Sequence, residues 1–222
     1  MRSIGALRYP EKSHRKKVQL PKESVRLAEF FGIMIGDGGI NNPWQANITL
    51  NSVADVQYIE FVASLCTDLF GVSPAIRKRK GRNASIVSLA STTIVDFLVE
   101  KGLMRGNKLK QGLCIPEWIL TKRSYKSACV RGLMDTDGCL YVHRHTINHK
   151  KYQNIGLCFS SYSPGLIGQV AEIFVEFGIM PHISASGRNI YLYSQKDVSK
   201  YLDVFGSSND RIWSVHKNWR GD

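Results

Sequence analysis

Residues 31–38 of the chain read FGIMIGDG, and residues 131–138 read RGLMDTDG. Each segment has a glycine, three mostly apolar residues, a small residue and then Asp-Gly. The two acids, Asp37 and Asp137, lie 100 positions apart in a chain of 222 residues. Duplicated carboxylates at the ends of two apolar helices indicate one site built at a two-fold axis.

The composition favours a folded protein with a polyanionic partner. Hydrophobic residues make up 43% of the chain, which supports a core and argues against disorder. The formal net charge is +12, and so basic a balance favours nucleic acid over a membrane surface. Every apolar stretch is shorter than the ~20 residues of a membrane helix, so no membrane partner is expected.

The cysteines indicate a reducing environment. The chain has five, without CxxC spacing, and most lie in apolar runs: Cys66, Cys114, Cys129, Cys139 and Cys158. This pattern predicts buried, reduced thiols in an intracellular compartment rather than a disulfide scaffold or a zinc site. The compartment itself is otherwise unknown.

One order of elements occurs twice along the chain. In the first half we predict helices over 24–36, 55–70 and 92–101, an extended stretch over 40–51, and strands over 73–79 and 84–90. In the second half we predict helices over 127–136, 164–177 and 197–205, with strands over 139–146, 152–160, 183–186 and 190–194. The expected division is a basic N-terminal extension over 1–23, a unit over 24–115, a linker over 116–123 and a unit over 124–222.

The small residues in the two segments predict close helix packing. Gly32 and Gly36 share one helix face, and so do Gly132 and Thr136, which lets two backbones approach each other. Helices packed in this way would bring the two aspartates together.

Two acids at two helix C-termini repel each other and the helix dipoles, so a cation must compensate them. Divalent metal is the natural candidate, because hard cations take carboxylate and carbonyl oxygens. The predicted metal ligands are therefore Asp37 and Asp137, with the carbonyl groups of Gly36 and Thr136. Asp135 is expected to cap or to form a salt bridge, without a catalytic role.

The two segments resemble the signature motifs of the LAGLIDADG homing endonucleases, and the order of elements extends the resemblance from about Ser24 to Lys217. Two motifs in one chain are similar to the monomeric branch of that family. The first motif departs from the family pattern, with Ile35-Gly36 where Asp-Ala would stand. The resemblance implies an α+β fold of two pseudo-symmetric αββαββα units, each with a curved antiparallel sheet, that together form a DNA-binding saddle.

The same resemblance implies an activity and its residues. Asp37 and Asp137 would be the metal-binding catalytic acids of a Mg²⁺-dependent endonuclease that cuts both strands of a long non-palindromic DNA site and leaves short 3′ overhangs. Asn51 and Ser160, each at the end of a predicted strand, match the place of a polar residue that orients water. A basic residue near the phosphate is also expected, and the candidates are Lys108, Lys110, Arg211 and Lys217.

The predicted hairpins carry side chains that can read base edges and neutralise phosphates. In the first half these are Asn41, Asn42, Trp44, Gln45, Asn47, Thr49, Arg77, Lys78, Arg79, Lys80, Arg82 and Asn83. In the second half they are Tyr141, His143, Arg144, His145, Asn148, Lys150, Lys151, Tyr152, Gln153, Asn154, Ser184, Ser186, Arg188, Asn189 and Tyr191. Because the charge clusters at hairpins, double-stranded DNA is the predicted partner, bound by a monomer. The histidines at 143, 145 and 149 lack the partners of a closed metal site and are expected to face DNA.

Two alternatives stay open beside a homing endonuclease of a mobile intron or intein. One is an RNA maturase, or a DNA-binding protein without cleavage, on the same fold; the intact Asp37 and Asp137 argue against a purely non-catalytic descendant. The other is a metal-dependent structural protein, which the clustered hairpin charge argues against.

Overall fold

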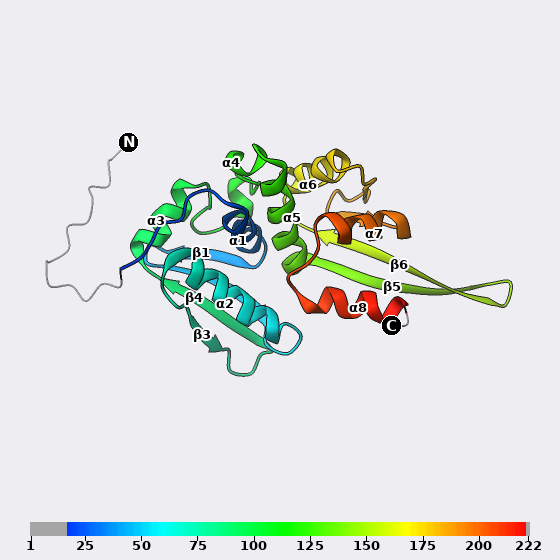
Figure 1. The fold of residues 1–222 in the computed structure, drawn as a ribbon, viewed down its shortest axis with the longest axis horizontal. Coiled ribbons are helices and arrows are strands. Elements are labelled where there is room, and N and C mark those ends of the chain that lie inside the picture. The colour runs from blue at the N-terminus through cyan, green and yellow to red at the C-terminus, as the bar shows by residue number, and fades with distance from the viewer. Residues whose placement is uncertain (1–16, 221–222) are drawn as a thin grey trace, which may run out of the picture.

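The two halves of the chain fold as two units that lie side by side (Figure 1). The structure, a computed structural model, describes residues 17–220, so most of the predicted extension over 1–23 lies outside the described residues. The first unit consists of α1 (Val25–Gly36), β1 (Gly38–Asn42), β2 (Gln45–Asn51), α2 (Val56–Phe70), β3 (Ala75–Lys78), β4 (Ala84–Ala90) and α3 (Thr92–Glu100).

A short 3-10 turn (Leu109–Gln111) and the one-turn helix α4 (Glu117–Leu120) connect the units. The second unit consists of α5 (Arg123–Asp137), β5 (Gly138–Ile147), β6 (Lys150–Ser160), α6 (Pro164–Glu176), β7 (His182–Ile183), β8 (Asn189–Leu192), α7 (Gln195–Val204) and α8 (Asp210–Arg220). The predicted α+β fold of two αββαββα units is confirmed.

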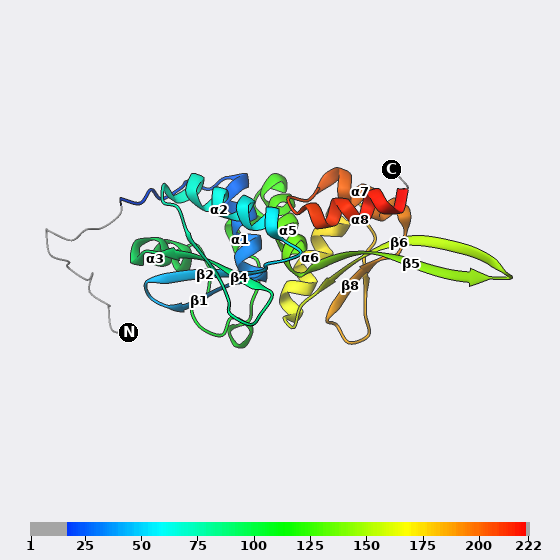
Figure 2. The ribbon, with the colours of Figure 1, turned by 90° about the horizontal axis from the view of Figure 1, so that it is seen from below.

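Each unit has one four-stranded antiparallel sheet, ordered β1-β2-β4-β3 in the first and β5-β6-β8-β7 in the second. Strand β2 shows why each sheet has two unlike faces: Ala46, Ile48 and Leu50 are buried, and the residues between them are polar. Helix α2 packs on the first sheet, and α7 and α8 pack on the second (Figure 2). We call the face that carries the alternate, polar residues the open face of each sheet.

Several element boundaries differ from the predictions. Helix α5 begins at Arg123 rather than Ser127, because Ser127 does not cap it; its hydroxyl donates to the Val204 carbonyl oxygen at 3.1 Å. Strand β7 has only two residues, since the chain turns at Ser184, whose N–H donates to the Asn189 carbonyl oxygen. Helices α4 and α8 were not predicted.

The prediction of buried cysteines holds for only part of the set. All five thiols are free, and Cys66 and Cys129 are buried, but Cys114 and Cys139 are exposed. Both exposed thiols lie in extended segments beside buried neighbours, so the alternation of side chains turns them outward. No described helix is long and apolar enough to span a membrane.

Helices α1 and α5 pack against each other at the centre of the molecule (Figure 1). A Cβ atom on Gly32 would overlap the Cys129 carbonyl oxygen, and one on Gly132 would overlap the Glu29 carbonyl oxygen. A Cβ atom on Gly36 would meet the Thr136 hydroxyl. The predicted close approach of the two helices is therefore confirmed, and it depends on the missing side chains.

Buried polar groups tie the two units together beside this helix pair. Arg131 of α5 forms two hydrogen bonds with the Glu29 carboxylate of α1, at 2.9 and 2.7 Å. Asp135 stands where the first motif has Ile35, and it accepts bonds from the Ser207 hydroxyl at 2.5 Å and the Ser208 N–H at 2.8 Å. Burial raises the pKa of Asp135 to about 7. Asp135 thus anchors the loop that precedes α8.

Candidate active site

The two packed helices end beside each other, and each ends at an aspartate. Asp37 follows the last residue of α1, and its N–H donates to the Ile33 carbonyl oxygen at 3.0 Å. Asp137 is the last residue of α5. A Cβ atom on Gly36 would lie 3.2 Å from Asp137 Oδ2, so this carboxylate lies against the last turn of α1. The structure brings the two predicted acids together from opposite units.

Burial acts on both carboxylates, and the charge of Asp137 acts on Asp37 as well. The pKa of Asp37 rises from 3.8 to about 6, first because burial removes water and then because the Asp137 charge is near. Burial also raises the pKa of Asp137, and the Lys108 charge opposes that rise. Within residues 17–220 neither carboxylate is in an ion pair. A cation between them would relieve this repulsion.

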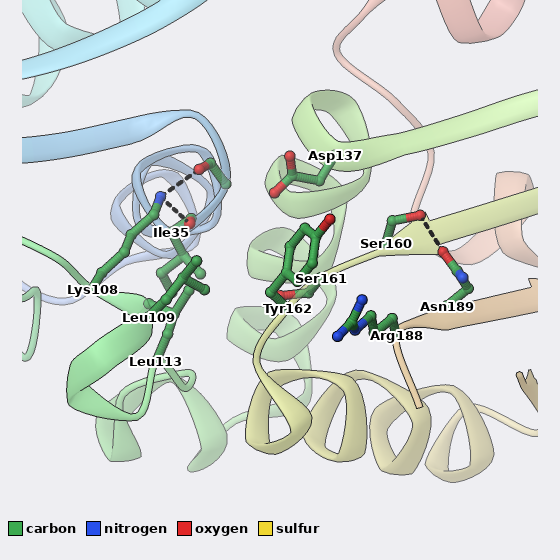
Figure 3. Close-up of a pocket in the computed structure, with 11 residues that line it drawn as sticks. Ile35, Lys108, Leu109, Leu113, Asp137, Ser160, Ser161, Tyr162, Arg188 and Asn189 are labelled. Atoms are coloured by element: carbon green, nitrogen blue, oxygen red, sulfur yellow. Dashed lines mark hydrogen bonds between the residues drawn. The ribbon is translucent and has the colours of Figure 1, made fainter. Parts of the chain in front are cut away.

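Lys108 reaches the end of α1 from the loop after α3. Its ammonium group donates to the carbonyl oxygens of Ile35 at 2.6 Å and Gly38 at 2.9 Å, and to that of Gly36 (Figure 3). Burial lowers the pKa of Lys108, while the carboxylates of Asp137 and Asp37 oppose that change. The ammonium group therefore neutralises the negative end of α1, and it already occupies one predicted metal ligand, the Gly36 carbonyl group.

Arg211 has the same place at the end of α5. It lies in the first turn of α8, and its Nη2 is 3.3 Å from the Asp135 carbonyl oxygen and 3.4 Å from that of Gly138. Its Nε is 3.4 Å from Oδ1 of Asp55, the residue that precedes α2. No carboxylate within residues 17–220 forms such an ion pair with Lys108. Within the described residues, the cation at the end of α5 is therefore paired with a carboxylate, and the cation at the end of α1 is not.

Two cavities flank the carboxylates. The Lys108 pocket has a volume of about 540 Å³ and is lined by Ile35, Gly36, Lys108, Leu109, Leu113, Asp137, Ser160, Ser161, Tyr162, Arg188 and Asn189. Figure 3 shows Lys108 on one wall and Asp137 on the opposite wall. The Arg211 pocket has a volume of about 470 Å³ and is lined by Asp37, Thr49, Leu50, Asn51, Ala54, Asp55, Asn83, Ala84, Thr136, Asp137, Gly138 and Arg211.

Each pocket holds one of the two predicted water-orienting residues. Asn51 lines the Arg211 pocket, and its Oδ1 accepts from the N–H groups of Val53 at 2.9 Å and Ala54 at 3.0 Å. Ser160 lines the Lys108 pocket, and its hydroxyl donates to Oδ1 of Asn189 at 2.6 Å. The remaining basic candidates, Lys110 and Lys217, are exposed and line neither pocket.

The open face of the first sheet carries small polar side chains. The strand register places Gln45, Asn47 and Thr49 of β2 there, together with Arg77 of β3. The Ser88 hydroxyl donates to Oδ1 of Asn47 at 2.7 Å and so orients that amide. The predicted basic residues of the β3–β4 hairpin are all exposed. Arg77 lies on the open face of β3, and Lys78 lies on the opposite face. The members of that hairpin are Arg77, Lys78, Arg79, Lys80, Arg82 and Asn83.

The open face of the second sheet is aromatic instead. The rings of His143 and His145 stack with centroids 5.2 Å apart, and Tyr152 stacks on His145 at 5.6 Å. Tyr191 and Tyr193 stack at 5.2 Å. Tyr141 and Asn154 share this face by register.

Three predicted DNA-binding residues of the second sheet face the other way. Strand alternation places Arg144, Lys151 and Gln153 on the helix-covered side, and Gln153 lines a cavity with residues of α7 and α8. Lys150 begins β6 beside the turn that Asn148 and His149 form with positive φ, and Ser184 and Ser186 bond each other in the β7–β8 turn.

The sequence reasoning missed two residues around the pockets and the helix that positions a third. Asp55 was taken only as a helix start, yet its side chain caps nothing; it accepts from Asn209 Nδ2 at 2.9 Å and pairs with Arg211. Tyr162 lines the Lys108 pocket beneath the Arg188 guanidinium, which lies 4.9 Å from its ring centroid. A signal existed for α8, which positions Arg211: Ile212, Val215 and Trp219 recur at helical spacing.

A donor set for a divalent metal is present, although it is small. Among residues 17–220 no group of three or more His, Cys, Asp or Glu side chains is arranged to hold a metal. The two aspartates nevertheless offer unpaired carboxylate oxygens with raised pKa values, close to main-chain carbonyl groups. Oxygen ligands of this kind suit Mg²⁺, which keeps several waters and takes only one or two carboxylates.

The second half of the chain matches a known protein family. Residues 124–209 match the sequence profile of the family described as the LAGLIDADG-like domain. No curated protein sequence matches the chain significantly.

The solved structures that resemble the chain are homing endonucleases. A mesophilic variant of the homing endonuclease I-DmoI has a TM-score of 0.55 and 17% identity, over 83% of this chain and 97% of that one. The meganuclease I-SmaMI, bound to uncleavable DNA, has a TM-score of 0.59 and 12% identity, over 87% of this chain and 88% of that one. The LAGLIDADG homing endonuclease I-LtrWI, bound to its target DNA, has a TM-score of 0.59 and 11% identity, over 87% and 89%.

At these identities the structural likeness establishes the fold alone. Residues 124–209 match the LAGLIDADG-like domain profile, and the chain as a whole has the two-unit fold of the LAGLIDADG homing endonucleases.

Proposed function

We propose that the protein is a monomeric, sequence-specific DNA endonuclease that uses a divalent metal, Mg²⁺, to hydrolyse one phosphodiester bond in each strand of a double-stranded target. The observation that carries the proposal is the pair of carboxylates, Asp37 and Asp137, at the touching ends of α1 and α5. The resembling structures support it, since they include a homing endonuclease bound to its target DNA and I-DmoI in complex with DNA and manganese.

The aspartates would hold the metal between them, with the Thr136 carbonyl group as a further ligand. The Gly36 carbonyl group would join them only through its second lone pair, because Lys108 already donates to it. A bound divalent metal supplies charge relief for the phosphate and lowers the pKa of a bound water. A fully ionised aspartate pair is needed to hold it, so activity should fall as the pH drops towards the raised pKa of Asp37.

The other polar groups would position the reactants. Asn51 and Ser160 would each hold a water in one pocket, since their own hydrogen bonds fix their orientation. Lys108 and Arg211 would each face one scissile phosphate and stabilise the charge that develops there. Two such half-sites about one axis suit one cut in each strand, and we propose the short 3′ overhangs that the family resemblance implies.

The open faces would read the DNA. Amides on the first sheet suit base edges in the major groove, and the β3–β4 cations suit phosphates. On the second sheet the tyrosine hydroxyls and imidazole nitrogens would form the hydrogen bonds to base edges. We also propose the predicted division at residues 24–115, 116–123 and 124–222 for the two DNA-binding units and their linker.

The proposal is tested by selection from a randomised duplex library with Mg²⁺, which reports cleavage and target together. Asp37→Asn and Asp137→Asn should each reduce the single-turnover cleavage rate at least about 10³-fold, because a neutral amide holds the metal poorly, while DNA binding persists. Asp203→Asn, an exposed acid on α7, is the matched control and should cleave like the wild type.

Cleavage that survives both substitutions would refute the assignment of the aspartates. Tight, sequence-specific binding without a cut at any library site would favour the non-cleaving alternative. Preferential binding of a structured RNA over every duplex would favour the maturase.

A further inference from the structure

The two pockets beside the carboxylates correspond to each other across the pseudo-two-fold axis, but their charges differ. The Lys108 pocket is lined by two cations, Lys108 and Arg188, and by one acid, Asp137. The Arg211 pocket is lined by one cation, Arg211, and by three acids, Asp37, Asp55 and Asp137. A phosphate group is therefore attracted more strongly by the first pocket than by the second.

Asp55 contributes one charge of this difference, and it is the acid that lies closest to Arg211. Its side chain is only 13% exposed and lies within 3.4 Å of the Arg211 Nε. Asn209 Nδ2 at 2.9 Å and the Asn51 N–H at 3.3 Å hold the carboxylate in place. Charges that are shielded from water and held at such distances interact more strongly than pairs at the open surface.

The corresponding helix start in the second unit is neutral. There Ser163 caps α6, and its hydroxyl donates to the Leu113 carbonyl oxygen at 2.5 Å. Within residues 17–220 no acid in this position compensates Lys108, whose hydrogen bonds there all go to main-chain carbonyl oxygens. The two helix starts, Asp55 and Ser163, therefore account for one charge of the difference between the pockets.

The guanidinium group of Arg211 is held from two sides. Its Nη groups donate to the carbonyl oxygens of Asp135 and Gly138, and its Nε lies 3.4 Å from Oδ1 of Asp55. A guanidinium group held in this way offers a phosphate less charge and fewer free N–H groups than it otherwise would.

We infer that the protein cuts the two DNA strands in a fixed order, first the strand whose phosphate enters the Lys108 pocket, and that Asp55 is the positioning residue that slows the second cut. The inference rests on the proposed endonuclease function. Each cut adds one water across a P–O bond: the hydroxyl joins phosphorus, and the proton ends on the departing oxygen. A nicked duplex therefore accumulates between the two cuts.

The test is single-turnover cleavage of the selected target with Mg²⁺, with the two strands carrying different 5′ labels and resolved under denaturing conditions. The wild type should cut one strand several-fold faster than the other. Asp55→Asn keeps a side-chain oxygen for Asn209 and removes the charge, so the slow strand should speed up about fivefold while the fast strand changes by less than about twofold.

Asp68→Asn is the matched control. It lies on the same helix α2 and loses a comparable carboxylate–arginine contact, the exposed pair with Arg26 at 2.6 Å. This variant should leave both rates unchanged. Lys108→Met identifies the strands, since it should slow the fast cut more than the slow one.

A conservative variant separates positioning from a structural effect. Asp55→Glu keeps the negative charge beside Arg211, so it should keep the slow strand slow, whereas Asp55→Asn should not. A general loss of folding would slow both strands in either variant. Equal strand rates in the wild type, or an unchanged rate ratio in Asp55→Asn, would overturn the inference while leaving the endonuclease intact. No cleavage of either strand at any pH would overturn both.

Discussion

The two sheets have the same strand order and unlike open faces. The first carries amides and hydroxyls such as Asn47, Thr49 and Ser88, with cations gathered at one hairpin. The second carries stacked rings, among them His145, Tyr191 and Tyr193, and its strands β5 and β6 extend much further from the body of the molecule (Figure 1). The comparison shows that the repeated plan constrains the backbone and leaves the open side chains free to diverge.

The helix pair shows the opposite behaviour, because packing constrains both copies. Gly32 and Gly132 each face the other helix's main chain, where no side chain fits. One helical turn further along the pair the constraint relaxes: Gly36 faces Thr136, a side chain rather than backbone. Symmetry is therefore strict where backbone meets backbone and loose where side chains meet.

The largest expected effect comes from a substitution where the main chains of α1 and α5 touch. Gly32→Ala places a methyl group on the Cys129 carbonyl group, and rigid backbone must move, so we expect about 3 kcal/mol of destabilisation. In Gly36→Ala the new methyl group meets the Thr136 side chain. The double variant Gly36→Ala/Thr136→Ala should therefore recover most of the stability that Gly36→Ala loses. Urea unfolding of the metal-free protein measures both.

Gly39→Ala is the control for this series, since a Cβ atom there has nothing within 4 Å. It should change the free energy of unfolding by no more than about 0.5 kcal/mol. A Gly32→Ala protein as stable as that control would show that the helices do not depend on this contact.

A smaller effect concerns the stability that the chain loses when Asp37 is ionised. Because the pKa of Asp37 is about 6 in the folded chain and 3.8 ordinarily, the folded state binds this proton more tightly. The free energy of unfolding should therefore fall as the pH rises from about 4 to about 6 and stay low above that range. Asp37→Asn should raise stability by about 1 kcal/mol at pH 7.5 without metal, after a discount for partial exposure, and by nothing near pH 4.

Thermal melts over this pH range, with Asp203→Asn as the control, check the prediction. Added Mg²⁺ should stabilise the wild type and leave Asp37→Asn nearly unchanged, because binding to the folded state alone adds stability. Equal melting curves for wild type and Asp37→Asn at pH 7.5 would show that neither burial nor the Asp137 charge makes the ionised Asp37 costly.

The repeated sequence pattern made the central helix contact, the paired carboxylates and most strands predictable from sequence. Glycine spacing and Asp-Gly placement predicted the α1–α5 contact and the paired carboxylates, because both follow from local chemistry on one helix. Alternation predicted most strands. The sequence also pointed to Asn51, Ser160 and Lys108, through the family resemblance rather than through their chemistry.

The unpredicted part of the site depends on contacts between distant segments. Nothing around Asp55 indicates that Asn209, 154 positions later, bonds its carboxylate. Which face a hairpin residue occupies also depends on register: Arg77 and Lys78 read alike in sequence and lie on opposite faces. Single-sequence patterns carry no signal for either, since both arise only when the chain closes on itself.

The smallest expected effect sharpens the comparison between the open faces. If the β3–β4 cations meet phosphates, Arg77→Ala should reduce the slope of log affinity against log salt by about 1, because one fewer counterion is released. Lys78→Ala is the matched control: the neighbouring cation is equally exposed but lies on the opposite face of β3, so its slope should stay close to that of the wild type. Tyr191→Phe, on the second open face, should weaken binding of the selected target while leaving the slope unchanged, because it removes a hydroxyl and no charge. Fluorescence anisotropy across a salt series measures all three, and equal slope changes for Arg77→Ala and Lys78→Ala would mean that the hairpin attracts DNA with both faces and that register does not divide its charges.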